Sequence, residues 1–512
     1  MLTERVATRA ALDLREHLAN LEAHGKLRRV QKEVDKDWEI GCIARWVFQA
    51  VPDEERYALL FERIKGYDIP LTVGAFGGSR AIYALAMGCQ PEEIYQRWIE
   101  ALTAPLPPEE VRDAPVQEVR FHGDAVDLYR LPVPVWTPGK DAGPYFTSHA
   151  VVTRDPDTGI VNVGNYRLQL RGRNEVGIQI FPNQHIGLHL QRYRARGYRT
   201  MPIAIAIGIP PTLGLCATAK IPYGVDEYAV AGAMARAPLQ VTRALTVDLP
   251  VPARAEIVLE GEVPVDELVL EGPFGEYVGY MGLPGPKHHV YVHTLTCRAR
   301  PIFQSYISQL PPSESCVLQQ QASGAMLYKH LVHDLRVPGV RDVHWTEASS
   351  RTHTIIQMKP LYPGHARKVM MLAASILDGI SPKWVTVVDE DIDIRDPFMV
   401  EWAIASRVDP ATDVVILNDM EMTVLDPATT LRVNEDKTGA PLTERVTGAK
   451  LLIDATIKRT YPNISLPPKD LMYRALERWE ETGLPPITVP ERTRKLLDAH
   501  PGNELYYEPF RR

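Results

Sequence analysis

The stretch His149–Leu170, HAVVTRDPDTGIVNVGNYRLQL, decides the fold at the centre of this chain. It holds two β-rich runs on either side of Asp155–Gly159, whose sequence DPDTG is a hairpin turn signal. Along the second run, strand alternation directs Tyr166 and Arg167 to opposite faces. The stretch therefore predicts an antiparallel pair of strands joined by a tight turn.

Strand-like runs continue around this hairpin from about Val116 to Ile307. Two helices are predicted to interrupt them, the first at 184–196 and the second beginning near Val225. Many short strands with few helices favour a barrel-like domain. The other strand-like runs are RGRNEVGIQIF from Arg171, MPIAIAIGI from Met201, AEIVLEG from Ala255, ELVLEG from Glu267 and HHVYVHTLTCRARPIFQSYI from His288.

Helices and strands alternate in the segments on both sides of this β-rich region. Before it, helices are predicted near 12–21 and at 38–50, 79–87 and 91–102, with strands from 27, at 58–64 and at 69–76. After it, strands are predicted at 352–359, 383–393 and 412–420, with helices at 365–379 and 396–408. These patterns predict an α+β multidomain chain with an N-terminal α/β domain (1–113), a β-rich middle domain (114–313), a linking helix (314–337), a C-terminal α/β domain (338–460) and a tail (461–512).

Composition excludes several classes of protein. The chain has 512 residues, 45% apolar and 24% charged, which is typical of a globular protein with two to four domains. A net charge of −7 gives no general attraction for nucleic acid. The five cysteines form no CxxC pair, so neither a disulfide framework nor a thiolate zinc site is expected. The N-terminus does not resemble a signal peptide, and no apolar run reaches membrane-spanning length, so a cytoplasmic protein is expected.

Several polar patterns in the β-rich region could carry chemistry. His185 and His189 lie four residues apart on a predicted helix, as in zinc proteases, but Ile186 replaces the general-base glutamate of that motif. Hydrogen bonding in the core or at the surface is the alternative for both histidines. Asp226 and Glu227 stand at a helix start, where capping and the helix dipole explain acidic side chains equally well.

The run EGPFGEYVGY places Glu271 and Glu276 five residues apart in a glycine-rich segment. Surface turns also carry acids, so this run by itself is a weak signal. Two carboxylates near an arginine are nevertheless suited to acid–base chemistry, because like charge raises one pKa while the arginine lowers the other.

Taken together, these segments resemble the UbiD family, whose members are decarboxylases that use prenylated FMN. The resemblance rests on NVGNYR, QHI at Gln184–Ile186, GVDEYAVAG and EGPFGEYVGY. From Arg167, the family pattern expects its histidine, helix-start glutamate and first active-site glutamate about 18, 60 and 104 residues on, which is where His185, Glu227 and Glu271 stand. Later segments, VVDEDIDIRD and LLIDATIK among them, extend the resemblance over about residues 10–460.

The resemblance implies that the middle domain is a flavin-binding split β-barrel with a metal-assisted phosphate site. Asn162, His185 and Glu227 would bind a divalent ion that also holds the flavin phosphate. Oxygen and imidazole ligands suit Mn²⁺, or Mg²⁺ or Fe²⁺, better than a structural zinc. A potassium ion would share Glu227 and backbone carbonyls around 216–219. The remaining cofactor-binding residues implied are Arg167, Gln184, Ala217, Thr218 and Lys383.

The resemblance also implies a catalytic network of Glu271, Arg167 and Glu276. Glu276 is expected to return a proton to carbon after CO₂ leaves, while Glu271 and Arg167 position it. The chain departs from the family at two places. Ala217-Thr218 stands where some members have a serine pair, and Tyr277 stands where members acting on catechol acids often have histidine, which argues against a protocatechuate-type pocket.

The resulting prediction is a carboxy-lyase that reversibly and non-oxidatively decarboxylates an aromatic, heteroaromatic or α,β-unsaturated carboxylate. Two alternatives are an FMN-dependent reductase and a non-catalytic subunit of a carboxylase complex. Expected partners are the small carboxylate, CO₂, a prenyl-flavin synthase that supplies the cofactor, and further copies of this chain in a homodimer or larger assembly, joined through the tail. Nucleic acid and membrane are not expected as partners. The site is expected between the middle and C-terminal domains, whose hinge could gate it.

Overall fold

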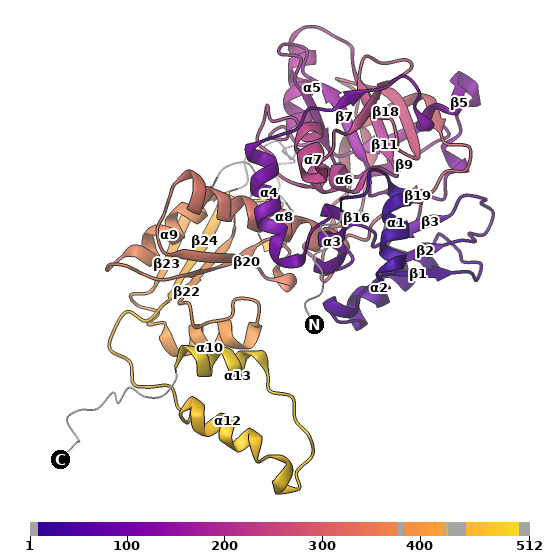
Figure 1. The fold of residues 1–512 in the computed structure, drawn as a ribbon. Helices are drawn as coiled ribbons and strands as arrows, with labels where there is room; N and C mark the ends of the chain where they lie inside the picture. Colours follow the sequence, from indigo (N-terminus) through magenta and orange to yellow (C-terminus); the bar gives the residue numbers. More distant parts are fainter. Residues whose placement is uncertain (1–8, 377–381, 424, 429–446, 501–512) are drawn as a thin grey trace, which may run out of the picture.

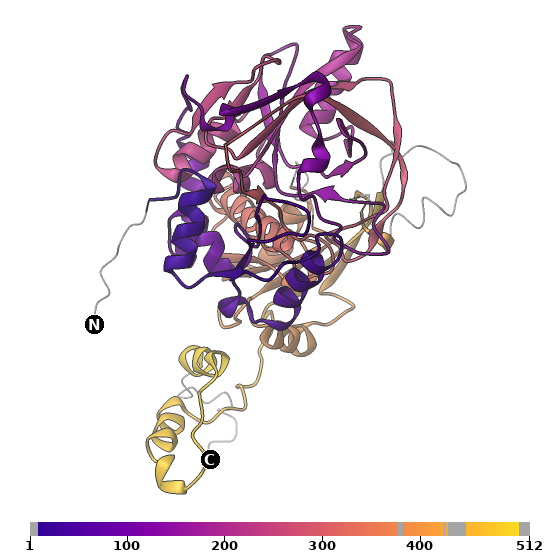
Figure 2. The same ribbon diagram turned by 90° about the vertical axis from the view of Figure 1, so that its right-hand side faces the viewer.

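The computed structural model describes residues 9–376, 382–423, 425–428 and 447–500. Sheets of four, ten and five strands follow one another, with a three-stranded sheet and a two-stranded hairpin beside them. Figures 1 and 2 show the N-terminal and β-rich segments packed together, with the C-terminal sheet and the tail helices extending from them. The mixture of helices and sheets agrees with the predicted α+β class. The predicted domain limits and the split barrel stay predictions.

The N-terminal segment forms a four-stranded sheet in the order β1-β2-β3-β19. β1 and β2 are parallel, β2 and β3 are antiparallel, and β19 adds to β3 in parallel from more than 200 residues later in the chain. The Asp13 side chain caps the first helix and the Ser79 side chain the third, each accepting a hydrogen bond from a first-turn N–H. The elements are α1 (Leu14–Ala23), β1 (Leu27–Val30), α2 (Glu39–Ala50), β2 (Ala58–Phe61), β3 (Leu71–Val73), α3 (Arg80–Met87) and α4 (Ile94–Thr103).

The β-rich segment forms a ten-stranded sheet in the order β6-β9-β10-β18-β14-β11-β7-β8, with β5 and β15 also paired to β18. The hairpin predicted at Asp155–Gly159 is confirmed, because β7 and β8 pair antiparallel and the Gly159 N–H donates to the Asp155 carbonyl. The strands are β5 (Val119–His122), β6 (Tyr145–Phe146), β7 (Ala150–Arg154), β8 (Val161–Gly164), β9 (Leu168–Leu170), β10 (Glu175–Ile178), β11 (Thr200–Ile207), β14 (Ile257–Pro264), β15 (Val269–Glu271) and β18 (Gly285–Cys297).

Smaller elements complete this segment. β4 (Glu109–Glu110), β12 (Gln240–Arg243) and β13 (Pro250–Pro252) form the three-stranded sheet, and β16 (Phe274–Gly275) pairs with β17 (Met281–Gly282). The helices are α5 (His185–Ala195), α6 (Pro211–Thr218) and α7 (Glu227–Ala235).

One prediction in this segment is wrong, and one helix of the segment was not predicted. The strand expected from His288 to Ile307 is split into β18 and β19 (Phe303–Gln304), because Pro301 cannot continue a strand ladder and the chain passes there to the N-terminal sheet. The helix α6 was not predicted. Nearly every residue in it is buried, so it shows no amphipathic period that would distinguish it from a buried strand.

Helix α8 (Glu314–Tyr328) links the β-rich segment to a five-stranded C-terminal sheet. A π-helical turn at Lys329–Asp334 follows it, within the range 314–337 predicted for a linking helix, whose role as a domain boundary stays a prediction. The sheet order is β20-β21-β22-β24-β23, parallel in the centre and antiparallel at both edges. The elements are β20 (Val340–Trp345), β21 (His353–Met358), α9 (His365–Ala374), β22 (Trp384–Val388), α10 (Pro397–Arg407), β23 (Val414–Glu421) and β24 (Thr447–Ala455).

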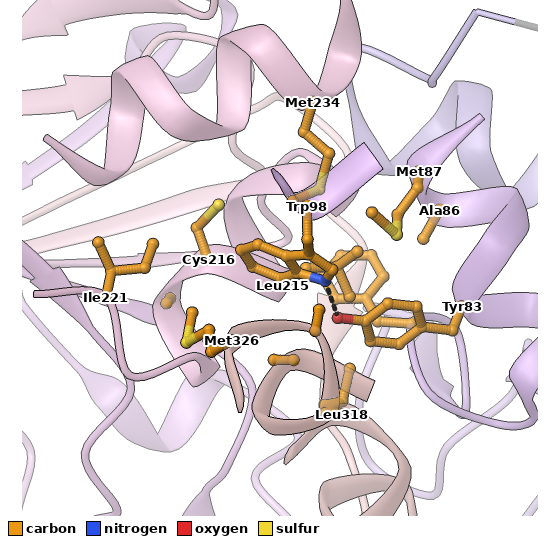
Figure 3. Close-up of a cluster of buried hydrophobic side chains, with 14 of the residues drawn as sticks. Tyr83, Ala86, Met87, Trp98, Leu215, Cys216, Ile221, Met234, Leu318 and Met326 are labelled. Carbon is orange, nitrogen blue, oxygen red and sulfur yellow. Dashed lines mark hydrogen bonds between the residues drawn. The ribbon is translucent and has the colours of Figure 1, made fainter. Parts of the chain in front are cut away.

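A buried carboxylate fastens α8 to the N-terminal segment. The Glu314 side chain, 1% exposed, accepts hydrogen bonds from the backbone N–H groups of Gly74, Phe76 and Gly77. A continuous apolar core runs from α1 across α8 to the C-terminal sheet. Figure 3 shows one part of it, where the Trp98 indole donates to the Tyr83 hydroxyl at 2.9 Å.

The tail helices α12 (Lys469–Glu477) and α13 (Glu491–Ala499) lie beyond the C-terminal sheet (Figure 1). Leu496 of α13 packs against a small core that includes Met399 and Val400 of α10. Residues 501–512 of the predicted tail and the last residues of the helix predicted at 365–379 lie outside the described residues. Within the described ranges, no helix is long and apolar enough to span a membrane.

Candidate active site

The structure brings Arg167 and Glu271 together across 104 residues of sequence. Arg167 lies between β8 and β9, and Glu271 ends β15, where it is paired with Gly285 of β18. Arg167 Nε donates to Glu271 Oε1 at 3.0 Å, and Arg167 Nη2 donates to Glu271 Oε2 at 2.6 Å. This two-pronged contact holds the plane of the guanidinium in one orientation, which a lysine could not provide.

Glu276 reaches the other side of the same guanidinium. It lies in the turn between β16 and β17, where its N–H donates to the Tyr280 carbonyl at 2.8 Å. Arg167 Nη1 donates to Glu276 Oε1. A Cβ atom at Gly282 would stand 2.9 Å from that oxygen, so glycine is required there for the carboxylate and the guanidinium to meet. Arg167 thus bridges both glutamates, and the catalytic roles of the three residues stay predictions.

The cluster of Glu271, Arg167 and Glu276 is almost completely withdrawn from solvent, with side-chain exposures of 0%, 8% and 10%. Burial raises the pKa of Glu276, the charge of Arg167 opposes that rise, and the nearby Glu271 carboxylate adds to it. The two carboxylates, in turn, raise the pKa of Arg167 against the effect of its own burial. The arrangement can therefore hold a proton on Glu276 beside a fixed positive charge.

Two residues of this neighbourhood were missed by sequence reasoning. Lys287, on β18, is buried, and burial lowers the pKa of its ammonium group. The positive charge of Lys287 in turn lowers the pKa of Glu276. Tyr145, on β6, packs against Phe274 with ring centroids 4.2 Å apart and ring planes tilted by 35°, and burial followed by the charge of Glu271 raises the pKa of Tyr145. Neither residue lies in a motif, and only the pairing of distant strands places them here.

Two of the predicted metal ligands, Asn162 and Glu227, lie near another residue that was missed, Tyr166. The Asn162 amide donates to the Tyr166 hydroxyl at 3.3 Å. Burial raises the pKa of the Tyr166 phenol, and the charge of Glu227 raises it further. A hydrogen bond from the backbone of Ile186, the neighbour of His185, lowers the same pKa. Glu227 also accepts a hydrogen bond from the Val163 N–H at 3.1 Å, which ties the start of α7 to β8.

These residues offer ligands that fit a divalent cation. Glu227 is 4% exposed, makes no ion pair with any described residue, and has its pKa raised to about 8 by burial. A buried carboxylate without a basic partner suits a metal ion, and the amide of Asn162 and the imidazole of His185 would be neutral ligands in the predicted set. Among the described residues no three His, Cys, Asp or Glu side chains cluster as a metal site, so the predicted set depends on the amide.

His185 and His189 share a neighbour, because both rings lie edge-on to the ring of Tyr223, at centroid distances of 5.1 and 5.9 Å. His189 also makes polar contacts of its own: its Nδ1 lies 3.0 Å from the Thr153 hydroxyl, and its Nε2 lies 3.4 Å from the hydroxyl of Tyr223. Burial lowers the pKa of His189 to about 4, so the ring is neutral near pH 7. Tyr223 donates onward to Asp155 of the β7–β8 turn. These bonds favour the structural alternative for His189 over the protease-like pair.

The other predicted cofactor-binding residues lie in three places. Gln184 accepts a hydrogen bond from the Phe181 N–H just before α5, and the Ala217 carbonyl accepts one from the Asn165 N–H. Thr218 donates to the carbonyls of Gly214 and Leu215 inside α6. Lys383, in contrast, pairs with Asp426 at 2.8 Å within the C-terminal segment. Its predicted reach to a flavin phosphate stays a prediction, as does the potassium site.

Three family models match consecutive parts of the chain. They describe the N-terminal domain (residues 18–102), the Rift-related domain (109–311) and the C-terminal domain (317–455) of 3-octaprenyl-4-hydroxybenzoate carboxy-lyase. An uncharacterized protein of Archaeoglobus fulgidus is 35% identical over 426 residues, which cover 79% of this chain and 86% of that protein.

Solved structures match over most of their length. The UbiD-class enzyme HmfF from Pelotomaculum thermopropionicum, in an evolved dimeric form in complex with prFMN, is 35% identical with a TM-score of 0.77, covering 89% of this chain and 97% of that one. Vanillic acid decarboxylase from Sedimentibacter hydroxybenzoicus, in its closed form, is 30% identical with a TM-score of 0.79, covering 93% and 98%. The predicted multidomain α+β fold is therefore confirmed.

Proposed function

This chain belongs to the UbiD family of carboxy-lyases, and on that premise we propose that it is a reversible, non-oxidative decarboxylase that uses prenylated FMN. Its substrate would be an aromatic, heteroaromatic or α,β-unsaturated carboxylate. The observation that carries the proposal is the buried bridge of Arg167 between Glu271 and Glu276. The similar structure of HmfF in complex with prFMN supports the choice of cofactor.

Prenylated FMN, when bound, supplies the electron sink that a carbon atom losing CO₂ requires. The residues of this chain then have three tasks. Glu276 gives its proton to the carbon atom that CO₂ has left, and takes one up in the reverse direction. Arg167 fixes the position of Glu276, and Glu271 fixes the orientation of Arg167. The burial of all three side chains keeps bulk water from protonating that carbon without control.

Asn162, His185 and Glu227 would hold a divalent ion against the flavin phosphate. His185 and Glu227 are the first residues of α5 and α7, so two helix N-termini add partial positive charge on the same side. The donor set suits Mn²⁺, with Mg²⁺ or Fe²⁺ as alternatives. A potassium ion sharing Glu227 belongs to the same proposal.

A co-expression experiment tests this function. The chain is produced with and without a prenyl-flavin synthase, and both preparations are offered a panel of aromatic, heteroaromatic and α,β-unsaturated acids while CO₂ release is measured. We expect release only from the co-expressed enzyme and loss of it in Glu276→Gln. Equal turnover with unmodified FMN, or activity that Glu276→Gln leaves intact, would overturn the proposal.

Assembly is part of the proposal. A homodimer or larger assembly would form through the tail, whose helices α12 and α13 lie beyond the C-terminal sheet (Figure 1). The vanillic acid decarboxylase similar to this chain has been solved in open and closed forms. We extend that behaviour to this chain as a hinge between the β-rich and C-terminal segments. The reductase and the non-catalytic subunit are not favoured, because neither would need the Glu-Arg-Glu bridge.

A further inference from the structure

Gln309, in the loop between β19 and α8, has a backbone conformation that favours glycine. Its φ is +98°, in the left-handed region that residues with a side chain seldom adopt. Its side chain is buried, and its Nε2 has no hydrogen-bond acceptor among the described residues. A strained backbone and an unpaired buried donor both lower stability, and such features are kept mainly at functional sites. Gln309 is therefore a candidate for a role in the reaction.

Helix α2 of the N-terminal segment holds this loop. Arg45 Nη2 donates to Gln309 Oε1, so the guanidinium fixes which edge of the amide faces away from the helix. One turn later on the same face of α2, Gln49 Nε2 donates to the Pro311 carbonyl at 3.2 Å. These two contacts keep the loop, and with it the strained backbone at 309, in one place.

The Gln309 side chain lies against the hairpin that carries Glu276. A Cβ atom at Gly275 would stand 2.5 Å from Gln309 Cγ and 2.7 Å from Gln309 Nε2, so only glycine lets the two segments approach this closely. The loop also covers the far end of the same turn, because a Cβ at Gly279 would stand 3.3 Å from Leu310 Cδ1. Gly275 directly precedes Glu276, so the place of Gln309 limits where the backbone of Glu276 can lie.

We propose that Gln309 is a positioning residue for the proton donor: held by Arg45, it supports Gly275 and so places Glu276 within reach of the carbon atom that CO₂ leaves. This inference rests on the proposed function and adds to it a contact from the N-terminal segment. Arg167 holds the carboxylate of Glu276, whereas Gln309 supports the backbone from which that side chain extends. A proton passes only over a hydrogen-bond distance, so the place of this backbone controls turnover.

Gln309→Gly in the flavin-loaded enzyme separates positioning from stability. Glycine adopts a φ of +98° without strain, which offsets the lost contact with Arg45, so the melting temperature should stay within about 2 °C of wild type. Turnover should nevertheless fall about 10- to 100-fold, with KM changed less than about threefold, because a displacement of about 1 Å can cost ~100-fold in rate. Turnover within twofold of wild type, or a loss of bound flavin together with a lower melting temperature, would overturn the inference.

A double-mutant cycle identifies the residue through which Gln309 acts. If Gln309 works by placing Glu276, its replacement should cost turnover only while position 276 carries the acid. Gln309→Gly should therefore change the residual turnover of Glu276→Gln by less than about twofold. An equal fall in both backgrounds would show that Gln309 acts independently of Glu276 and would overturn the inference.

Variants of Arg45 test how the amide is held. Arg45→Met should reproduce the loss of turnover, and Arg45→Lys, which keeps a donor for Gln309 Oε1, should recover part of it; full activity of Arg45→Met would overturn this part of the inference. Arg336→Gly is the matched control, because Arg336 is exposed and also has a positive φ, +51°. It should leave turnover unchanged.

Hydrogen–deuterium exchange keeps this inference separate from the proposed function. Gln309→Gly should speed the exchange of backbone amides at 274–282, and Arg336→Gly should not. Unchanged exchange at 274–282 would overturn the inference. If Gln309→Gly shows the faster exchange but the wild-type enzyme releases no CO₂ from any acid, the support of this hairpin by Gln309 is upheld and the proposed function is the part that fails.

Discussion

Replacing Gly282 with alanine should disable the site with a single methyl group. A Cβ at this position would lie 2.9 Å from Glu276 Oε1 and 3.1 Å from Arg167 Nη1, whereas non-bonded heavy atoms need about 3.5 Å. The pairing of Gly282 with Phe274 keeps the backbone in place, so the Glu276 carboxylate must move by about 0.5 Å. Since a displacement of about 1 Å can cost ~100-fold in rate, turnover should fall about tenfold or more.

Gly285→Ala is the matched control for this change. Gly285 lies three residues further along the chain, at the start of β18, and a Cβ there meets nothing within 4 Å. Both variants are loaded with cofactor, checked by flavin absorbance, and compared by initial rates of CO₂ release. Overpacking should also lower the unfolding free energy of Gly282→Ala by ~1 kcal/mol. If the two variants turn over within twofold of each other, the contact between Arg167 and Glu276 does not control the reaction.

Four further changes address the same site. Glu276→Gln should retain flavin and lose about 10²–10⁴-fold in turnover and in substrate-carbon exchange with D₂O, and rates within a few-fold of wild type would exclude it as the proton donor. Arg167→Lys should also fail in the CO₂ assay, because an ammonium cannot bridge two carboxylates; full activity would contradict this. Lys287→Met removes a charge that lowers the pKa of Glu276, so the alkaline limb of the pH–rate profile, where Glu276 loses its proton, should move to higher pH, and an unmoved limb would refute the coupling. Glu227→Ala should lose both divalent metal and flavin, and metal analysis showing full occupancy would refute its assignment.

The local elements were predictable from the sequence where a period or a turn signal was present. DPDTG marked the β7–β8 hairpin because its residues favour a tight turn, and Asp226 capped α7 as its position indicated. The interruption of the strand around Pro301 and the almost completely buried helix α6 were not predicted. In both cases the outcome depends on which distant surface buries the segment, and no local pattern records that.

The same distinction applies to the site. Glu271, Arg167 and Glu276 could be named because they lie in recognisable motifs, and the structure brings them together. Lys287 and Gln309 could not, because each stands in an unremarkable run and acquires its neighbours only through strand pairing or through contact with α2. The topology of the fold decides which distant side chains meet. Local patterns in a single sequence do not reveal those contacts.

The position of β19 constrains how this chain can acquire its structure during synthesis. The N-terminal sheet is incomplete until residues 303–304 join β3, and the loop at 74–77 finds the carboxylate of Glu314 later still. A ribosome adding about 5–20 residues per second must therefore work for roughly ten seconds or more after the first strands emerge. During that interval the unpaired edge of β3 is open to wrong pairing with other strands.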